Sequence, residues 1–350
     1  MIRTHVLPTD AGIARAHDDL PALGVLLDPD RLATLTQDLG LGTYSLDRLR
    51  LKPHASVTAV LRPVGGTGPR LLVRGFAPEP WATKRRKDLD RAARFGLAAH
   101  DITAERMVVV AAAADRSLPE LARLHPDSGP GTYRRRGAGG TAFRGWFRTL
   151  SHNPARRWVG CGEAEDGSRV VVRLHADRPS ELLPWQPGRP WQPGDPTPRL
   201  DRIVRRDGRS VRIEQRVAAA VRGLGMLSAD WGHRAATLAD RIRTPLARTP
   251  LAPAHGDLTP DQVVVDAGRL HVLDWDEAGD WPLGWDAATW AAGLVLEGWP
   301  AGQVAMPAVP APEVRAAAAI MRGPEPFRRR HSHWAERTDA LLAHAEEALS

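Results

Sequence analysis

Short apolar runs alternate with turn residues through the first half of the chain, and longer helical patterns fill the second half. Runs such as residues 71–73, 107–112 and 170–172 are rich in Val, Leu or Ala and are bounded by polar or turn-forming residues. Their length and composition are typical of β-strands joined by hairpin turns. None reaches the roughly 20 apolar residues that a membrane-spanning helix requires. We therefore predict small antiparallel sheets followed by a helical region, with no membrane association.

Two stretches of the first half resemble each other in sequence and order. Each predicts a short helix, a strand, a Pro-centred turn, a second strand, a Gly-bearing turn and a third strand. An internal duplication explains this agreement, and chance similarity between two hairpins is the alternative. The corresponding segments are residues 18–23, 51–57 and 70–74 in the first stretch and residues 116–121, 151–159 and 169–173 in the second.

Two segments rich in Gly and Pro predict the boundaries between domains. Residues 129–140 end in a Gly-rich run that is expected to be flexible, and residues 184–196 are too proline-dense for a helix or an inner strand. Beyond them, Val211–Gln215 predicts a strand and Val217–Ala247 has helical periodicity. We expect three domains: an extra small-lobe-like domain over residues 1–128, a small β lobe over residues 141–215 and a helical lobe over residues 216–350.

The net charge of +7 is carried mainly by arginine. The basic clusters at residues 134–136 and 328–330 are short and lack the interleaved aromatic residues of single-strand binders, so nucleic-acid binding is not favoured. Cys161 is the single cysteine and is expected to be a buried thiol, and no Cys or His spacing matches a structural zinc site. The start of the chain lacks a secretory signal pattern. We expect a cytoplasmic protein.

The most informative block begins with His255-Gly256-Asp257 and ends with Leu273-Asp274-Trp275-Asp276. Between these motifs, two short apolar segments joined by a turn predict a hairpin that brings Asp257 and Asp274 face to face. Phosphoryl transfer needs one carboxylate for the acceptor hydroxyl and a second, with another oxygen donor, for Mg²⁺. The spacing matches the kinase loop His-x-Asp-x-x-x-x-Asn, with Gln262 in place of Asn. Although each residue alone could belong to a turn or cap, their order together favours phosphoryl transfer.

These motifs resemble the core of the aminoglycoside phosphotransferase and choline kinase superfamily. The resemblance implies a bilobal, protein-kinase-like α+β fold with a small antiparallel β lobe, a mainly helical C-lobe and an additional N-terminal copy of the small lobe. It also implies ATP and Mg²⁺ as cofactors. The implied site residues are Asp257 as the catalytic base, His255 beside it as a structural residue, Asp274, Gln262 and Asp276 toward Mg²⁺, and Asp286, which would cap the next helix and steady the loop.

The resemblance extends to the second copy, which it implies is the nucleotide-binding lobe. Asn153 and Arg156 would flank a turn over the phosphates, and Arg173 stands where a phosphate-pairing lysine is usual. Arginine keeps the charge but changes the reach and the donor geometry. Glu181 is a candidate ion-pair partner of Arg173, with a solvated glutamate as the alternative, and Glu214 would meet the adenine.

Three functions from different classes fit these residues. An ATP-dependent kinase would phosphorylate a hydroxyl of a small molecule, such as an aminoglycoside, another antibiotic, a sugar or a choline-like alcohol, or of Ser or Thr in a peptide. A kinase-like binding module without turnover is the second, and the N-terminal domain could hold a protein partner. A metal-dependent phosphohydrolase is the third, with His255, Asp257, His271 and Asp274 as ligands.

A cationic acceptor would call for an acidic pocket. Asp280, Glu297 and the pair Glu346-Glu347 could line one in the helical lobe. A solvated helix face explains the same residues equally well. The sequence leaves both interpretations open.

Overall fold

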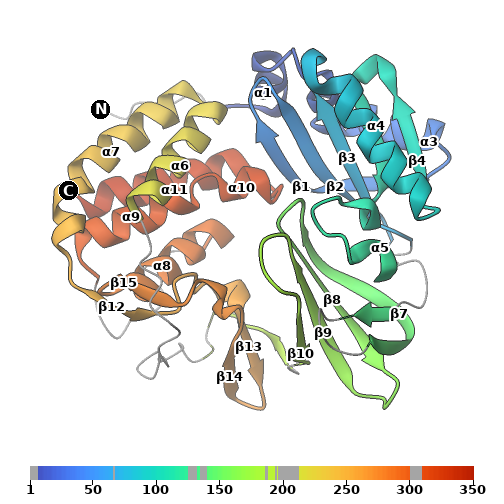
Figure 1. Ribbon diagram of the computed structural model, residues 1–350. Helices are drawn as coiled ribbons and strands as arrows, with labels where there is room; N and C mark the ends of the chain where they lie inside the picture. The colour runs from blue at the N-terminus through green and yellow to red at the C-terminus, as the bar shows by residue number, and fades with distance from the viewer. Residues whose placement is uncertain are drawn as a thin grey trace. The chain divides into compact units, whose positions relative to one another are not determined.

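The computed structural model describes residues 7–65, 68–124, 132–134, 140–185, 188–193, 195, 213–299 and 310–350. They divide into two compact units, which we call the β unit, Thr9–Trp185, and the helical unit, the described residues after Trp185 together with residues 7–8. Antiparallel sheets fill the β unit and helices dominate the helical unit (Figure 1). The mixed α+β class predicted from the sequence is thus confirmed. Most of the predicted linker over residues 129–140 lies outside the described residues, and the predicted domain limits stay predictions.

The first sheet of the β unit has five antiparallel strands in the order β1-β2-β3-β5-β4. Apolar side chains of Val60, Leu72 and Val110 pack with Ala92 of helix α4, which lies across the sheet in Figure 1. The elements in chain order are α1 Asp10–Ala16, α2 Pro21–Leu26, α3 Pro29–Asp38, β1 Tyr44–Lys52, β2 Ser56–Pro63, β3 Leu71–Phe76, α4 Pro78–Arg94, β4 Ala99–Ile102 and β5 Met107–Ala111.

The second sheet also has five antiparallel strands, in the order β10-β9-β8-β7-β6. Its core is built around Phe147, Trp158 and Val172, with Leu121 of the short helix α5 packed against them. The elements are α5 Leu121–Leu124, β6 Thr132–Arg134, β7 Gly140–Asn153, β8 Arg157–Ala164, β9 Arg169–His175 and β10 Glu181–Pro184.

Both predicted Pro-centred turns form, and they share an unusual backbone conformation. His54, between β1 and β2, has φ 53°, and Ala155, between β7 and β8, has φ 60°. The two sheets differ after β3 and β9, because α4 follows β3 whereas β9 leads to its neighbour β10 without a helix. The similarity between the sheets therefore covers β1–β3 and β7–β9 with the turns between them.

A buried carboxylate joins the two sheets. Asp115 is fully buried and accepts hydrogen bonds from Arg74 Nη2 of β3 at 3.0 Å, from His152 Nε2 of β7 at 3.2 Å and from the Ala155 amide at 2.8 Å. Burial by itself raises the pKa of Asp115, but the hydrogen bond from His152 and the charges of His152 and Arg74 outweigh burial and hold that pKa well below its usual range. This junction explains why both sheets belong to one compact unit.

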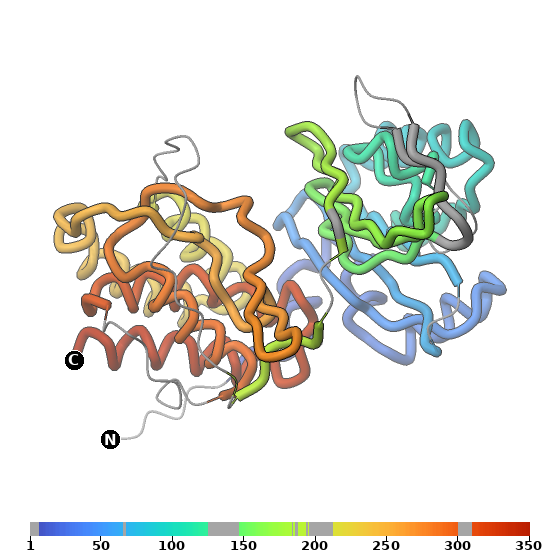
Figure 2. The backbone as a smooth tube through the Cα atoms, turned by 90° about the horizontal axis from the view of Figure 1, so that it is seen from below, coloured from blue at the N-terminus to red at the C-terminus, as the bar shows by residue number. Residues whose placement is uncertain are grey.

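The helical unit combines long helices with two small sheets, of strand order β11-β13-β14 and β12-β15. In Figure 2 the yellow-green β11 segment runs beside the orange hairpin of β13 and β14, with which it pairs. No described helix has both the length and the hydropathy needed to cross a membrane. The elements are β11 Arg189–Pro190, α6 Ile213–Leu227, α7 Ala229–Arg248, β12 Leu251–Ala254, β13 Val263–Asp266, β14 Arg269–Val272, β15 Gly279–Pro282, α8 Trp285–Glu297, α9 Pro312–Arg322, α10 Glu325–Arg328 and α11 Trp334–Ala348.

Two sequence predictions in this unit need correction. The strand predicted over Val211–Gln215 is wrong where the chain is described, because Ile213 begins helix α6 and buried residues then recur every three or four positions. The helix predicted over Val217–Ala247 is two helices. Ser228 separates them, since its side chain accepts a hydrogen bond from the Trp231 amide at 3.4 Å and thereby caps α7.

Candidate functional site

The candidate catalytic loop leaves β12 through His255-Gly256-Asp257 and ends in a short 3₁₀ turn at Pro260–Gln262. Gly256 has φ 84°, and a Cβ atom there would lie 2.3 Å from the Glu277 carbonyl oxygen and 2.3 Å from Trp281 Nε1. Only glycine combines this backbone conformation with so close an approach. Gly256 therefore lets the loop pack directly against Glu277 and Trp281, in the segment that follows Asp274 and Asp276.

His255 is fully buried and connects the loop to the following hairpin. Its Nε2 donates to the Leu273 carbonyl at 2.8 Å, and its Nδ1 accepts from the Asp257 amide at 3.3 Å. These partners assign the proton to Nε2. The imidazole thus fixes the backbone of Asp257 relative to the residue before Asp274, in agreement with the structural role expected for His255.

The hydrogen bonds of His255 also weaken the phosphohydrolase hypothesis. Both ring nitrogens are engaged, so neither is available to a metal in this conformation. His271 pairs with Val264 in the β13–β14 register and does not belong to the catalytic loop. The four proposed metal ligands of a phosphohydrolase are therefore not assembled.

Asp286 anchors the same loop from helix α8. Its carboxylate accepts from the His255 amide at 2.8 Å and from the Gly256 amide at 2.9 Å. Burial raises the pKa of Asp286, although the two amide hydrogen bonds oppose the rise. The N-cap of α8 is Gly284, so Asp286 caps the catalytic loop and not its own helix. The expectation that it steadies the loop agrees with these contacts, whereas the expected helix N-cap is wrong.

The β13–β14 hairpin positions two of the three candidate Mg²⁺ ligands, Gln262 and Asp274. Val263 pairs with Val272, and the Leu273 amide donates to the Gln262 carbonyl at 2.8 Å, so Gln262 lies opposite Leu273 at the open end of the hairpin. Asp274 follows at once. It adopts the left-handed conformation with φ 61° and begins the 3₁₀ turn Trp275–Glu277. A non-glycine residue held there costs about 1 kcal/mol or more, a strain that is often found at functional sites.

The chemistry of these side chains suits Mg²⁺. Gln262, Asp274 and Asp276 are all partly buried, and they offer the amide and carboxylate oxygens that a hard cation prefers. Within the described chain, Asp257, Asp274 and Asp276 do not form a group whose ligand atoms all lie within 4.8 Å of one another. A site whose carboxylates do not form one tight group is compatible with Mg²⁺, because this ion is usually held by one or two carboxylates together with substrate phosphates.

Arg322 contacts the candidate site but was not selected from the sequence. It is 8% exposed at the end of α9, and its guanidinium forms an ion pair with the Asp257 carboxylate, whose side chain is 33% exposed. The pair brings α9 against the candidate base. Arginine in the last turn of a helix is ordinarily explained by the helix dipole, which is why the sequence carried no signal for this contact.

A second charged contact lies at the other end of the loop. Asp261 accepts from Arg329 Nη1 at 2.8 Å and from the Thr259 hydroxyl. Desolvation opposes ionisation, but the Arg329 charge and the Thr259 hydrogen bond outweigh it and lower the pKa of Asp261 to about 2. The Asp261 side chain is 41% exposed, so solvent screens part of this attraction.

The acidic side chains considered for a cationic acceptor are largely engaged elsewhere. Glu297 lies 4.0 Å from Arg337, and Glu346 accepts from Arg234 Nε at 2.9 Å. Asp280 lies in β15, opposite Pro253 of β12. These contacts favour the interpretation that the glutamates stabilise helix packing.

The predicted nucleotide residues are divided between the two units. Arg173, Asn153 and Arg156 belong to the β unit, whereas Glu214 lies exposed in the first turn of α6 in the helical unit. The expected pair of Arg173 with Glu181 is present, with Nη1 and Oε2 3.9 Å apart on neighbouring strands. Glu214 thus belongs to a helix.

A second candidate for the phosphate-pairing cation, Arg74, lies on β3 of the first sheet. Arg74 of β3 pairs with Asp88 of α4 at 3.1 Å and with Asp115 at 3.0 Å, and all three side chains are buried. A cation on the third strand that pairs with an acid on the following helix is the arrangement that positions ATP phosphates in protein kinases. The sequence pointed to Arg74 but not to Asp88, which lies 14 residues further on.

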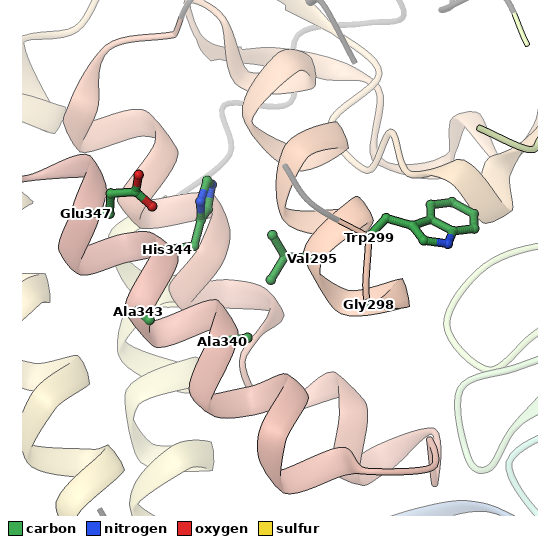
Figure 3. A pocket seen from close by; sticks show the side chains of 7 residues that line it. All are labelled: Val295, Gly298, Trp299, Ala340, Ala343, His344 and Glu347. Carbon is green, nitrogen blue, oxygen red and sulfur yellow. The ribbon is translucent and has the colours of Figure 1, made fainter. Parts of the chain in front are cut away.

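A cavity of about 430 Å³ opens between α8 and α11 in the helical unit (Figure 3). Val295, Trp299 and His344 line it, and burial lowers the pKa of His344. Of the acidic residues considered for a cationic acceptor, Glu347 lines this cavity, whereas none of the residues predicted to bind nucleotide or Mg²⁺ or to act as the base does.

No protein-family model and no curated protein sequence matches the chain. Solved structures that resemble it include a Plasmodium vivax ethanolamine kinase, with TM-score 0.38 and 8% identity over 58% of this chain and 81% of that one. A Cryptosporidium parvum choline kinase has TM-score 0.34 and 10% identity over 92% and 95% of the two chains. A macrolide 2′-phosphotransferase type I has TM-score 0.28 and 16% identity over 58% and 92%. These neighbours belong to the protein-kinase-like superfamily that the motifs resemble, but with TM-scores below 0.5 the functional argument rests on the site itself.

Proposed function

We propose that the chain is a phosphotransferase that moves the γ-phosphate of ATP to a hydroxyl group of a small molecule. The observation that carries the proposal is the anchoring of Asp257 by His255, which bonds both to the Asp257 amide and to the residue before Asp274. A candidate base and a candidate metal carboxylate are thereby held by one buried side chain. Catalysis of phosphoryl transfer depends mainly on positioning and electrostatic stabilisation.

In this proposal one group of residues acts on the proton of the acceptor hydroxyl and another group binds the metal. Asp257 orients the acceptor hydroxyl and receives its proton, while His255 and Asp286 position the loop. Asp274 and Gln262 would hold Mg²⁺, with Asp276 beside them, and the ion would offset charge on the ATP phosphates. Glutamine is one methylene longer than the usual asparagine but offers the same amide oxygen.

Two arginines are candidates for the ATP phosphates. Arg173 is on β9 of the second sheet, where its Nη1 lies 3.9 Å from Glu181 Oε2. Arg74 is on the third strand of the first sheet, where Asp88 of the following helix pairs with it at 3.1 Å. We retain Arg173, with Asn153 and Arg156 at the preceding turn, as the phosphate side of the site. Arg74 is buried between two carboxylates and has the more structural surroundings.

We further propose that the fold is bilobal and that the first sheet is an additional copy of the small lobe. Support comes from the matching order of β1–β3 and β7–β9. It also comes from the left-handed conformation of His54 and Ala155 in corresponding turns. A conformation that non-glycine residues rarely adopt is a more specific similarity than strand order alone.

The proposal is tested by calorimetric titration of ATP with Mg²⁺ into the wild type and into Asp274→Ala. We expect the dissociation constant to rise by about tenfold or more in the variant, because the metal loses its principal carboxylate. Asp266→Ala, which removes a carboxylate at the far end of the same hairpin, is the matched control and should bind like the wild type. Equal binding by all three proteins would exclude Asp274 as the metal ligand.

A binding module without turnover is the second candidate, and the Arg322–Asp257 ion pair favours it. A carboxylate already paired with a buried guanidinium is less available to an acceptor hydroxyl. Acceptor-dependent ATP consumption distinguishes the two functions. We expect the wild type to sustain it and Asp257→Asn to lower its rate by about 10²- to 10⁴-fold. Binding of ATP with no turnover for any hydroxyl acceptor would favour the binding module.

A further inference from the structure

Three potential metal ligands that have no role in the proposed phosphoryl transfer meet in the β unit. His17 ends helix α1, Asp19 follows it, and His54 lies in the turn between β1 and β2. One ligand atom from each of the three side chains lies within 4.8 Å of the other two. Among the described residues this is the one group of three His, Cys, Asp or Glu side chains that satisfies that distance.

The state of His17 points to a ligand at this place. Its side chain is 6% exposed, and neither Nδ1 nor Nε2 has a hydrogen-bond partner among the described residues. Oδ1 of Asp19 is likewise buried without a partner. Buried polar atoms in native proteins are nearly always paired, so two such side chains in contact require an explanation. A bound cation supplies one, because it takes up the lone pairs of a neutral imidazole and a carboxylate together.

The second imidazole is already aligned with this pair. His54 Nδ1 lies 3.1 Å from Asp19 Oδ2, and the rings of His54 and His17 pack edge to face with centroids 5.7 Å apart. The His54 backbone is held in the left-handed conformation with φ 53°.

The backbone around the three side chains is fixed by the core of the sheet. Arg106 Nη2 donates to the Asp19 carbonyl at 2.7 Å, and its Nε donates to the Phe76 carbonyl at 3.3 Å. The Ala77 amide donates to the Ala55 carbonyl, next to His54, at 3.0 Å. Both ligand-bearing segments are therefore anchored at the end of β3, and a site on anchored segments loses little freedom when it binds an ion.

We propose that His17, Asp19 and His54 bind a divalent transition-metal ion, with Zn²⁺ as the best match. Two imidazole nitrogens and one carboxylate oxygen are ligands that Zn²⁺ accepts in tetrahedral geometry, whereas Mg²⁺ prefers oxygen ligands. The His54 side chain is 73% exposed, so water can reach the fourth position. The ion ties the end of α1 to the turn between β1 and β2.

The proposal is tested on the full chain after removal of metal with EDTA and dialysis. Calorimetric titration with ZnCl₂ should give one site, and Co²⁺ should give the visible absorption of a tetrahedral complex. In His54→Ala and Asp19→Ala the Zn²⁺ dissociation constant should rise by about tenfold or more. His100→Ala, on the opposite edge strand of the same sheet, is the control and should bind like the wild type. Absence of a site, or equal affinity in all four proteins, would overturn the proposal.

A variant of the buried ligand gives a second readout that does not depend on binding. His17→Leu removes two unpartnered nitrogens from the core, so the metal-free variant should melt at or above the temperature of the metal-free wild type. Added Zn²⁺ should raise the melting temperature of the wild type but not that of His17→Leu. An equal rise in both proteins would exclude His17 as a ligand. Neither experiment involves nucleotide, so the result is independent of the proposed phosphotransferase activity.

Discussion

The buried guanidinium of Arg322 forms an ion pair with the carboxylate of Asp257 and thereby joins helix α9 to the candidate catalytic loop. The same loop is held from α8 by Asp286 and from the following hairpin by Leu273. Three separate elements thus converge on two residues, His255 and Asp257. The loop is supported from all three, as a site that must position a proton acceptor requires.

The Arg322–Asp257 pair should show strong energetic coupling. We expect Arg322→Met and Asp257→Asn each to lower the free energy of unfolding, and the double variant to lose less than the sum, with a coupling energy of about 1–3 kcal/mol. The estimate is below that of a fully buried pair because the Asp257 side chain is 33% exposed. Urea denaturation of the four proteins measures it. Additive losses would show that the two side chains stabilise the fold independently.

Gly256 should tolerate no side chain. Gly256→Ala is expected to cost about 3 kcal/mol or more, because the Cβ would lie 2.3 Å from a carbonyl oxygen and the backbone is left-handed. Gly268→Ala is the control, since φ is 79° there but no atom lies within 4 Å of the added Cβ. That variant should lose only about 1 kcal/mol. Similar midpoints of urea denaturation for both variants would contradict the close approach at Gly256.

The phosphate side of the proposed site can be assigned by two substitutions. Arg173→Ala should weaken ATP binding by about tenfold, as expected for loss of one charge-assisted contact. Glu181→Gln, which removes the neighbouring carboxylate but keeps the arginine, should bind ATP like the wild type or better. Titration calorimetry measures both. If Arg173→Ala binds normally and Arg74→Lys does not, the phosphate contact belongs to the first sheet.

Acid should weaken the junction between the two sheets of the β unit. The pKa of Asp115 is lower in the folded than in the unfolded chain, so its stabilising contribution is fully present above about pH 4 and is lost as the pH falls further. Asp115→Asn removes this dependence. Calorimetric melting between pH 7 and pH 3 should therefore give a difference between wild type and variant that is largest near neutrality and shrinks in acid. A constant difference would contradict the lowered pKa.

The sequence predicted those parts of the site whose interactions lie within one motif. Asp257, Gln262 and Asp274 were selected from order and spacing, and the turn residues between the apolar segments marked the hairpin that aligns them. Their supports come from the same segment or the next helix, as with His255 and Asp286. Local patterns carry such information because the partners are close along the chain.

Interactions between distant elements could not be predicted in this way. Arg322 lies 65 residues from Asp257, and nothing in the helical pattern of α9 distinguishes an arginine that reaches a carboxylate from one in solvent. The three side chains of the proposed metal site come from a helix end and a turn, and no spacing rule connects them. The start of α6 was missed because an apolar segment of a few residues fits a strand and a helix equally well.

The position of Asp115 has a consequence for how the β unit opens. Its donors come from β3 and from β7 and the turn after it, so separation of either sheet would leave a buried negative charge without some of its partners. A partly opened state that keeps one sheet intact is therefore penalised. The most protected amides of the two sheets should exchange with deuterium together, in one cooperative opening step. A protease should likewise cleave both sheets together, and not one sheet while the other stays folded.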